Sequence, residues 1–204
     1  VTIVNVGAGV SYGNLGYTHH SLQDYGLMRL FPNMMITSPG DDMEVRACMR
    51  YIVKNPQPSY LRLAKTKNKI LHKKIPSVKP GKWLPISIKH PKSKKIFLTT
   101  GNIAGLAKGL LTRAKYNKFS LYSLPIWGMK FKNIQLNQLK KYDQVMILED
   151  HLEDGGFGSW IKESTNNRNI KTKIISKSID KKIISKVGSE QYLLDKHYLK
   201  FFGK

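Results

Sequence analysis

The chain has 204 residues, enough for one large domain or two small ones, and it carries a net charge of +22. Its single cysteine, Cys48, excludes an intramolecular disulfide framework and suits a reducing cytoplasm, where we expect the protein to reside. No apolar run approaches the ~20 residues that a bilayer-spanning helix needs, so we expect no membrane segment. The chain starts at Val1, directly in an apolar run and without an initiator methionine, so we expect a fragment or a processed subunit.

The first third of the chain alternates between two apolar patterns. Period-two or continuous apolar runs predict strands at 2–7, 34–38 and 59–64, and helical spacing predicts helices at 20–31 and 41–55. Cys48 stands among the apolar positions of the second helix, so we interpret it as a packing residue. Strand, helix, strand, helix, strand at this length predicts a parallel sheet with right-handed crossovers.

Residues 65–95 interrupt this alternation with eleven lysines and no acidic residue, and we interpret them as a lysine-rich linker. The alternation then resumes with strands at 96–101, 119–125, 144–150 and 172–177. Helices are predicted at 102–116, at 136–142, from about 158 and around 189–199. The predicted fold class is α/β: a partial parallel-sheet domain at 1–64, then a three-layer α/β/α domain at 96–204.

The positive charge is spread unevenly along the chain. Residues 1–64 carry five basic and four acidic side chains, whereas residues 65–204 carry thirty and nine. A basic surface gains affinity for phosphate backbones by counterion release, so a nucleic-acid-binding module is one hypothesis. Most of the excess is lysine, however, with few interleaved aromatic residues to stack on bases. We therefore favour a solvated lysine-rich surface and consider nucleic-acid binding unlikely.

Two groups of motifs resemble the same family. The stretch GYTHHSLQDYGLMRLFPNMMITSPGDDMEV, followed by PSYLRLAK, is similar to the later half of the pyrimidine-binding domain of transketolase-type thiamine diphosphate enzymes. The stretches TTGNIAGLAKGLL, SLPIWGMK and VMILEDHLEDGGFGSW resemble the C-terminal domain of that family, which includes deoxyxylulose-phosphate synthase and the beta subunits of 2-oxo-acid dehydrogenases. The resemblance covers nearly the whole chain in the expected order. It implies a transferase activity on a ketol or acyl unit and a sugar-type substrate.

The resemblance implies thiamine diphosphate with Mg²⁺ as the cofactor of the complete enzyme. In the family, the diphosphate and its metal lie on a separate domain. The glutamate and the aromatic residues that hold the aminopyrimidine ring lie in the first half of the pyrimidine-binding domain. We expect both upstream of Val1 or on another subunit, so we assign no cofactor-binding or metal-ligating residue here and expect this chain alone to be inactive. The resemblance further implies a homodimer or a complex with a cofactor-binding transketolase N-terminal domain or subunit.

His19 is the expected catalytic residue. It aligns with the Thr-His histidine that lines the substrate channel in transketolases, and an imidazole can donate a hydrogen bond or shuttle a proton near neutrality. We expect Thr18, His20, Arg62 and Lys65 to bind substrate, with His20 standing where the family often has Gln and so acting indirectly. The alternative is that Thr18 and His19 only cap the helix predicted to begin near Ser21.

Departures from the family pattern weaken the expected phosphate contacts. Leu15 replaces an Asp that recognises a substrate hydroxyl, Gly7 replaces a phosphate-contacting His of transketolases, and Ala8 replaces an Arg of the synthases. Lys65 replaces a phosphate-binding Arg, and a lysine acts as a point charge without the bidentate contact of a guanidinium. Two hypotheses follow: the substrate is not an ordinary phosphosugar and carries its charge elsewhere, as a nucleotide-linked sugar does, or the chain is a non-catalytic partner.

The stretch EDHLEDGGFGSW places three glycines between a predicted strand and a predicted helix. A phosphate loop is one interpretation, but GGFGS lacks the spacing of either nucleotide fingerprint. We favour a tight left-handed turn that brings the helix onto the sheet. Its acidic residues and His151 form no complete metal site in the sequence, so we expect a solvated acidic turn. We assign no role to His72, His90 and His197.

Overall fold

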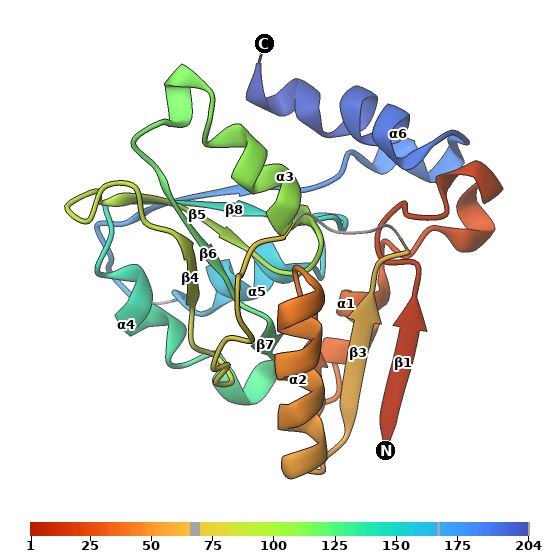
Figure 1. The fold of residues 1–204 in the computed structure, drawn as a ribbon, viewed down its shortest axis with the longest axis horizontal. Helices are drawn as coiled ribbons and strands as arrows, with labels where there is room; N and C mark the ends of the chain where they lie inside the picture. The colour runs from red at the N-terminus through yellow and green to blue at the C-terminus, as the bar shows by residue number, and fades with distance from the viewer. Residues whose placement is uncertain (66–69, 167, 204) are drawn as a thin grey trace.

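The computed structural model describes residues 1–65, 70–166 and 168–203, and its strands form two sheets (Figure 1). The first sheet has the strand order β1-β3-β2-β7, and the second has the order β4-β6-β5-β8-β9. The predicted α/β class is therefore confirmed. Within the described ranges, no helix is long and apolar enough to cross a membrane.

The first sheet begins as the sequence predicted. Strands β1 (Thr2–Val6), β3 (Ser59–Leu63) and β2 (Met35–Thr37) pair in parallel, and helix α2 (Asp42–Lys54) connects β2 to β3. The side chain of Asp41 caps α2 by accepting the N–H of Glu44 at 2.8 Å. Cys48 on this helix is fully buried and packs in the core as predicted.

Helix α1 (Asp24–Arg29) is shorter than the predicted helix at 20–31. Two 3₁₀ turns, η1 (Gly13–Leu15) and η2 (Tyr17–His19), precede it. Ser21 then exchanges backbone hydrogen bonds with Gly9, at 2.9 and 3.1 Å. This bridge holds the chain in an extended conformation where the apolar pattern had predicted the first helical turn.

Strand β7 (Ile126–Trp127) crosses from the second half of the chain into the first sheet, where it pairs antiparallel with β2. The Trp127 ring packs against Tyr25 at 5.1 Å between centroids, and against Trp160 at the same separation. Buried residues from both halves of the chain therefore share one hydrophobic cluster, and the shared members include Tyr25, Ile36, Tyr60, Leu98, Trp127, Phe157 and Trp160.

The second sheet has a parallel centre and an antiparallel edge. Its parallel strands are β6 (Ser120–Ser123), β5 (Lys95–Thr99), β8 (Gln144–Leu148) and β9 (Lys173–Lys177). Strand β4 (Leu84–Ser87) pairs antiparallel with β6 at the edge. The stretch 65–95 is therefore partly a sheet strand as well as a connection, and the exact domain boundaries stay a prediction.

Helices cover both faces of the second sheet (Figure 1). Helices α3 (Ile103–Leu110) and α6 (Glu190–His197) pack on the face that carries Phe97 and Leu148. Helices α4 (Gln135–Leu139) and α5 (Phe157–Glu163) pack on the face that carries Ile96 and Ile147. Neighbouring strand residues thus point to opposite layers, as a three-layer arrangement requires. The helix predicted at 102–116 ends at Leu110. The remaining 3₁₀ turns are η3 (Ala114–Tyr116), η4 (Met129–Phe131), η5 (Lys181–Ser185) and η6 (Leu199–Phe202).

Candidate active site

Gly7 and Gly9 turn the chain at the carboxyl end of β1. Their φ angles are +115° and +63°, and the N–H groups of Gly7 and Ala8 both donate to the Leu63 carbonyl. A Cβ on Gly7 would lie 2.6 Å from the ring of Tyr12. Side chains rarely adopt this backbone conformation, and Tyr12 already fills the space. Transketolases have a phosphate-contacting histidine at the position of Gly7. In this chain, Tyr12 fills the space that such a side chain would need.

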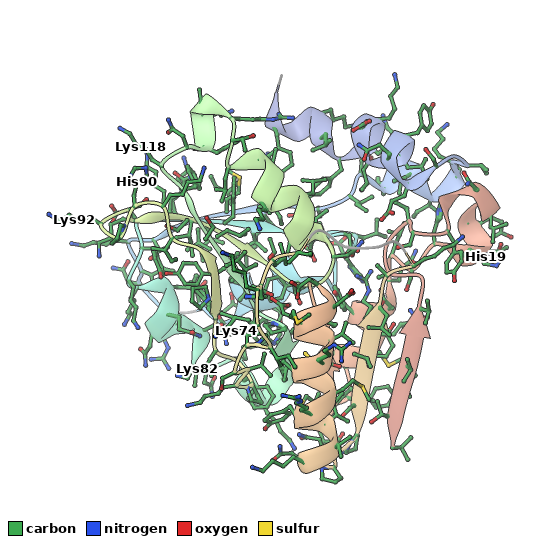
Figure 2. All side chains as sticks on the ribbon, viewed as in Figure 1. His19, Lys74, Lys82, His90, Lys92 and Lys118 are labelled. Carbon is green, nitrogen blue, oxygen red and sulfur yellow. The ribbon has the colours of Figure 1, made fainter. Side chains whose placement is uncertain are left out.

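Thr18, His19 and Lys65 gather around Tyr12 beyond this turn. The Oγ1 atom of Thr18 lies 2.9 Å from Nδ1 of His19, and the rings of His19 and Tyr12 are 6.1 Å apart between centroids. The ammonium group of Lys65 lies 4.8 Å from the centre of the Tyr12 ring, a cation–π contact. His19 is exposed at the outer end of the turns (Figure 2). Because Thr18 engages Nδ1, Nε2 is the ring nitrogen available to a ligand.

The capping alternative for Thr18 and His19 is wrong in this structure. Helix α1 begins at Asp24, its N-cap residue is Gln23, and no side chain caps it. The Thr18 hydroxyl instead lies near the Leu15 carbonyl and His19. Tyr12 is the member of this group that the sequence reasoning missed, although an aromatic residue inside a glycine-rich turn was an available signal.

A polar pocket of about 510 Å³ opens beside this group. Ser11, Gly13, Asn14 and Lys65 line it from the first half of the chain, and the first turn of α6 lines it from the second half. Lys65 therefore stands at the edge of a cavity that can admit a polar molecule. His19 is outside the pocket lining, on the neighbouring surface.

His20 turns inward, unlike its neighbour His19. It is half-buried, and burial lowers the pKa of its ring below the ordinary value against the opposing effect of the Gly13 and Ile184 carbonyls. The structure thus uses His20 to pack the 3₁₀ turns against the second half of the chain. The expectation of a substrate contact at His20 finds no support in this geometry.

The environment of Arg62 contradicts its expected role as a substrate contact. Its side chain has no solvent exposure, and its five N–H groups all have acceptors. Asp24 and Asp150 accept at 2.6 Å each, and the other acceptors are the Tyr25 hydroxyl and the carbonyls of Ser21 and Asp150. No donor of Arg62 remains for a substrate phosphate. The carboxylate of Asp150, in the loop after β8, is the internal anion that takes this place.

The charges around Arg62 shift the titration of their neighbours. Burial alone raises the pKa of Asp24, but Arg62 and His151 attract its carboxylate, and the net shift is downward. Burial lowers the pKa of His151, whose ring stacks on Tyr25 at 5.1 Å. These directions favour the ionised carboxylate of Asp24 and the neutral imidazole of His151.

The GGFGS stretch forms the turn that the sequence favoured. Gly155 has φ +72°, and a Cβ there would lie 3.0 Å from the Gly26 backbone. Glu149 is fully buried and accepts the N–H groups of Phe157 and Gly158 at the start of α5, at 2.6 and 3.0 Å. Burial raises the pKa of Glu149 to about 8. This helix N-terminus is occupied by a side chain of the protein and offers no open anion site.

His72 has a partner that sequence reasoning did not find. Its Nε2 atom lies 2.9 Å from Oε1 of the buried Glu44, which also accepts from the Gly40 N–H and the Ser123 hydroxyl. Burial lowers the pKa of His72, but Glu44 outweighs it and the net shift is upward. His90 is exposed on the β4–β5 connection (Figure 2).

Strand β1 leaves an apolar edge uncovered. Among the residues that the structure describes, it pairs with β3 alone, and Ile3, Val4 and Val6 are 44–55% exposed. Neighbouring strand residues point to opposite faces, so both faces of this edge are apolar and open. Leu30 and Phe31 next to α1 add further exposed apolar surface. An unpaired apolar edge of this kind invites strand pairing or docking.

The geometry defines the class as an α/β protein whose polar loops meet at the carboxyl ends of parallel strands. Residues 1–69 match the family described as transketolase, pyrimidine binding domain. A subunit of the apulose-4-phosphate transketolase from Phocaeicola vulgatus is 43% identical over 65 residues, which are 32% of this chain and 21% of that protein. The corresponding subunit from Actinobacillus succinogenes is 26% identical over 165 residues, which are 80% of this chain and 52% of that protein.

A split-gene transketolase, solved as an inactive beta4 tetramer, has the same fold with a TM-score of 0.75 and 20% identity over 97% of this chain and 62% of that one. The chain is transketolase-like and resembles the C-terminal part of transketolase-type thiamine diphosphate proteins. The match spans about a fifth of the length of the Phocaeicola vulgatus protein and about half of the length of the Actinobacillus succinogenes protein.

The described residues do not fit a diphosphate-bound Mg²⁺ ion. No group of three or more His, Cys, Asp or Glu side chains in the described ranges is placed to hold a metal ion. The carboxylates of Asp24 and Asp150 are engaged by Arg62. We therefore assign this chain no step of the reaction that passes through the cofactor.

Proposed function

We propose that this chain is the C-terminal part, or a subunit, of a transketolase-like enzyme that transfers or condenses a ketol or acyl unit on a sugar-type substrate. Thiamine diphosphate and Mg²⁺ are held by a partner polypeptide, either in a dimer or in a complex with a transketolase-type N-terminal subunit. His19 contacts the substrate through Nε2, where it donates a hydrogen bond to, or exchanges a proton with, a substrate oxygen.

The observation that carries this proposal is the neighbourhood of His19. An exposed imidazole, oriented by Thr18 and standing beside Tyr12 and Lys65, lies beyond the carboxyl end of β1, which is the edge strand of the first sheet. A partner that covers this edge brings its own residues close to His19. The names of the relatives, which describe subunits of transketolases, support a divided enzyme.

The remaining phosphate contacts point to the substrate class. Lys65 is the exposed cation beside the pocket of about 510 Å³, because Arg62 is used internally and Gly7 has no side chain. A single lysine attracts a charged group without fixing its orientation. We propose a substrate whose charge lies away from the usual sugar phosphate position, as in a nucleotide-linked sugar.

The test mixes this chain with the cofactor-binding transketolase polypeptide of the same organism and measures ketol transfer. Changing His19→Ala is expected to lower turnover about 100-fold or more, the usual contribution of a positioned acid or base. The matched control His90→Ala changes an exposed histidine elsewhere and leaves turnover unchanged. Tight binding of thiamine diphosphate by this chain alone, seen by calorimetry, contradicts the proposal.

A second candidate is a non-catalytic partner subunit with the same fold. The consumption of all five Arg62 donors by internal acceptors favours it, since a family contact has become part of the core. Full turnover of the mixed complex with His19→Ala supports this candidate over the catalytic one.

A further inference from the structure

The second sheet has a crevice at the point where its strand order reverses. Strands β5 and β8 are neighbours, and the sheet continues through β6 on one side and β9 on the other. After β5 the chain enters α3 on one face, and after β8 it enters α5 on the opposite face. Loops that diverge in this way leave a crevice beyond the carboxyl ends of the strands, where open α/β sheets bind ligands.

A pocket of about 310 Å³ lies between α3 and α6 on one face of the sheet, and Asn102 and Asp150 connect its lining to the carboxyl ends of β5 and β8. Its apolar wall consists of Ile103, Leu106, Leu110, Leu194 and Leu199. Its other lining includes Asn102 after β5, Asp150 after β8 and Glu190 at the start of α6. Arg113 also lines the pocket, and its Nη1 atom donates to the Gly203 carbonyl at 2.6 Å. An apolar wall with a few convergent polar groups is the usual composition of a small-molecule site.

Two buried acceptor atoms of the lining residues have no hydrogen-bond partner within the described ranges: Oδ2 of Asp150 and Oδ1 of Asn102. Asp150 is 3% exposed, and its Oδ1 atom accepts from Arg62. Buried polar atoms are normally paired, so each orphan atom requires an explanation. Both are acceptors and call for a donor.

The charge of the cluster around Asp150 also favours a positively charged donor. In this cluster the guanidinium of Arg62 forms ion pairs with two carboxylates, Asp24 and Asp150. His151 is the other basic group of this cluster, and burial lowers its pKa, so it is neutral near pH 7. A buried excess negative charge is costly unless a cation neutralises it.

We propose that the crevice between α3 and α6 binds a small organic cation, with an ammonium or guanidinium group at Asp150 and Asn102 and an apolar body against the leucines. His19 does not line this pocket, although the pocket shares Glu190, Gln191 and Leu194 with the neighbouring pocket of about 510 Å³ beside Lys65. The proposal does not depend on the proposed function. A metal ion is a poorer occupant, because the described residues provide no cluster of three or more metal-ligating side chains.

The test compares two probes of matched shape on the whole chain by calorimetry and amide NMR. Phenethylammonium and 3-phenylpropionate share a phenyl ring and a short linker but carry opposite charges. Phenethylammonium is expected to bind at least about tenfold more tightly, with shift changes in α3 and α6. Equal affinities, or no binding of phenethylammonium at ~10 mM, overturn the proposal.

Matched variants locate the binding site. Asn102→Ala removes one orphan acceptor at a position whose side chain does not cap α3, and it is expected to weaken phenethylammonium binding about fivefold or more. Asn117→Ala changes an exposed asparagine outside the pocket and is expected to leave affinity unchanged. Equal affinities of the two variants, with unchanged circular dichroism, also overturn the proposal.

Discussion

The Nη1 atom of Arg62 lies 2.6 Å from Oδ1 of Asp150, a contact between β3 and the loop after β8 that spans 88 residues of sequence. Both side chains are almost completely buried. Arg62 also binds Asp24 beside the start of α1, so one guanidinium fixes three segments relative to one another. The two sheets are therefore joined by an electrostatic contact as well as by the shared aromatic core.

Loss of Asp150 is expected to be severely destabilising. Asp150→Ala leaves part of the buried guanidinium unpaired, and breaking a buried ion pair costs about 3–5 kcal/mol of unfolding free energy. Urea denaturation measures this change. The control Glu153→Ala breaks the exposed pair with Lys162, at 2.9 Å, and is expected to cost at most about 1 kcal/mol. Similar losses in the two variants contradict the assigned role of Asp150.

The raised pKa of Glu149 predicts that the free energy of unfolding falls as pH rises. Its pKa is about 8 in the folded protein and near 4.5 when exposed, so between these values the folded state binds more protons than the unfolded state. This contribution is complete below about pH 4.5 and is lost as pH rises through about 8, with a slope of at most ~1.4 kcal/mol per pH unit. Denaturation across this range is expected to show a flatter slope for Glu149→Gln, whereas the exposed-site control Glu153→Gln keeps the slope.

His72 predicts a smaller effect of the same sign. Its pKa is raised by Glu44, so its stabilising contribution is present below the ordinary histidine pKa and is lost as pH rises through the raised value. The stability difference between the unmodified chain and His72→Gln is expected to be larger at pH 5.5 than at pH 8.5. An NMR titration of the His72 ring checks the shift directly, and His90→Gln serves as the control at an exposed site.

Placing a histidine at position 7, where transketolases have one, is expected to destabilise the fold unless Tyr12 is changed as well. Gly7→His combines a φ of +115° with a Cβ that would lie 2.6 Å from Tyr12, and strained positions cost about 1–3 kcal/mol. Adding Tyr12→Ala removes the clash and is expected to recover part of the loss in thermal unfolding. Gly203→Ala, also at positive φ but with open space around it, measures the backbone contribution alone. A Gly7→His chain as stable as the original contradicts this account.

The edge of β1 predicts where a partner docks. Val4→Lys places a charge on the uncovered strand and is expected to weaken complex formation with the cofactor-binding polypeptide at least tenfold. Val53→Lys makes the same change on α2, where Val53 is 72% exposed, and is expected to have little effect. Analytical ultracentrifugation of the two mixtures separates these outcomes, and equal binding excludes β1 as the docking edge.

The local patterns of the sequence were sufficient for most of the parallel strands. β1, β2 and β3 appear at the predicted places because each is a short apolar run, the usual pattern of strands in a parallel sheet. The first turn of the helix predicted at 20–31 does not form, because Ser21 pairs with Gly9, a contact that helical periodicity does not encode. Strand β4 was not predicted either, because the lysines and prolines around it indicated a linker.

The site residues were predictable in type but not in environment. His19, Thr18 and Lys65 do lie together, yet the ring that gathers them belongs to Tyr12. Arg62 was expected to face a substrate, because nothing in its own strand indicates that Asp150 approaches from the far part of the chain. Long-range partners decide whether an arginine serves a ligand or the core, and a single sequence carries no direct signal of them.

Strand β7 has one more consequence for the chain as a whole. Ile126 and Trp127 form the edge strand next to β2, and Trp127 packs in the shared aromatic cluster. We therefore expect that cutting the polypeptide within the lysine-rich connection would not separate the two pieces. We expect such a nick to leave a non-covalent heterodimer that keeps the shared aromatic interior. Two genes divided at this connection are therefore expected to encode pieces that assemble into one fold.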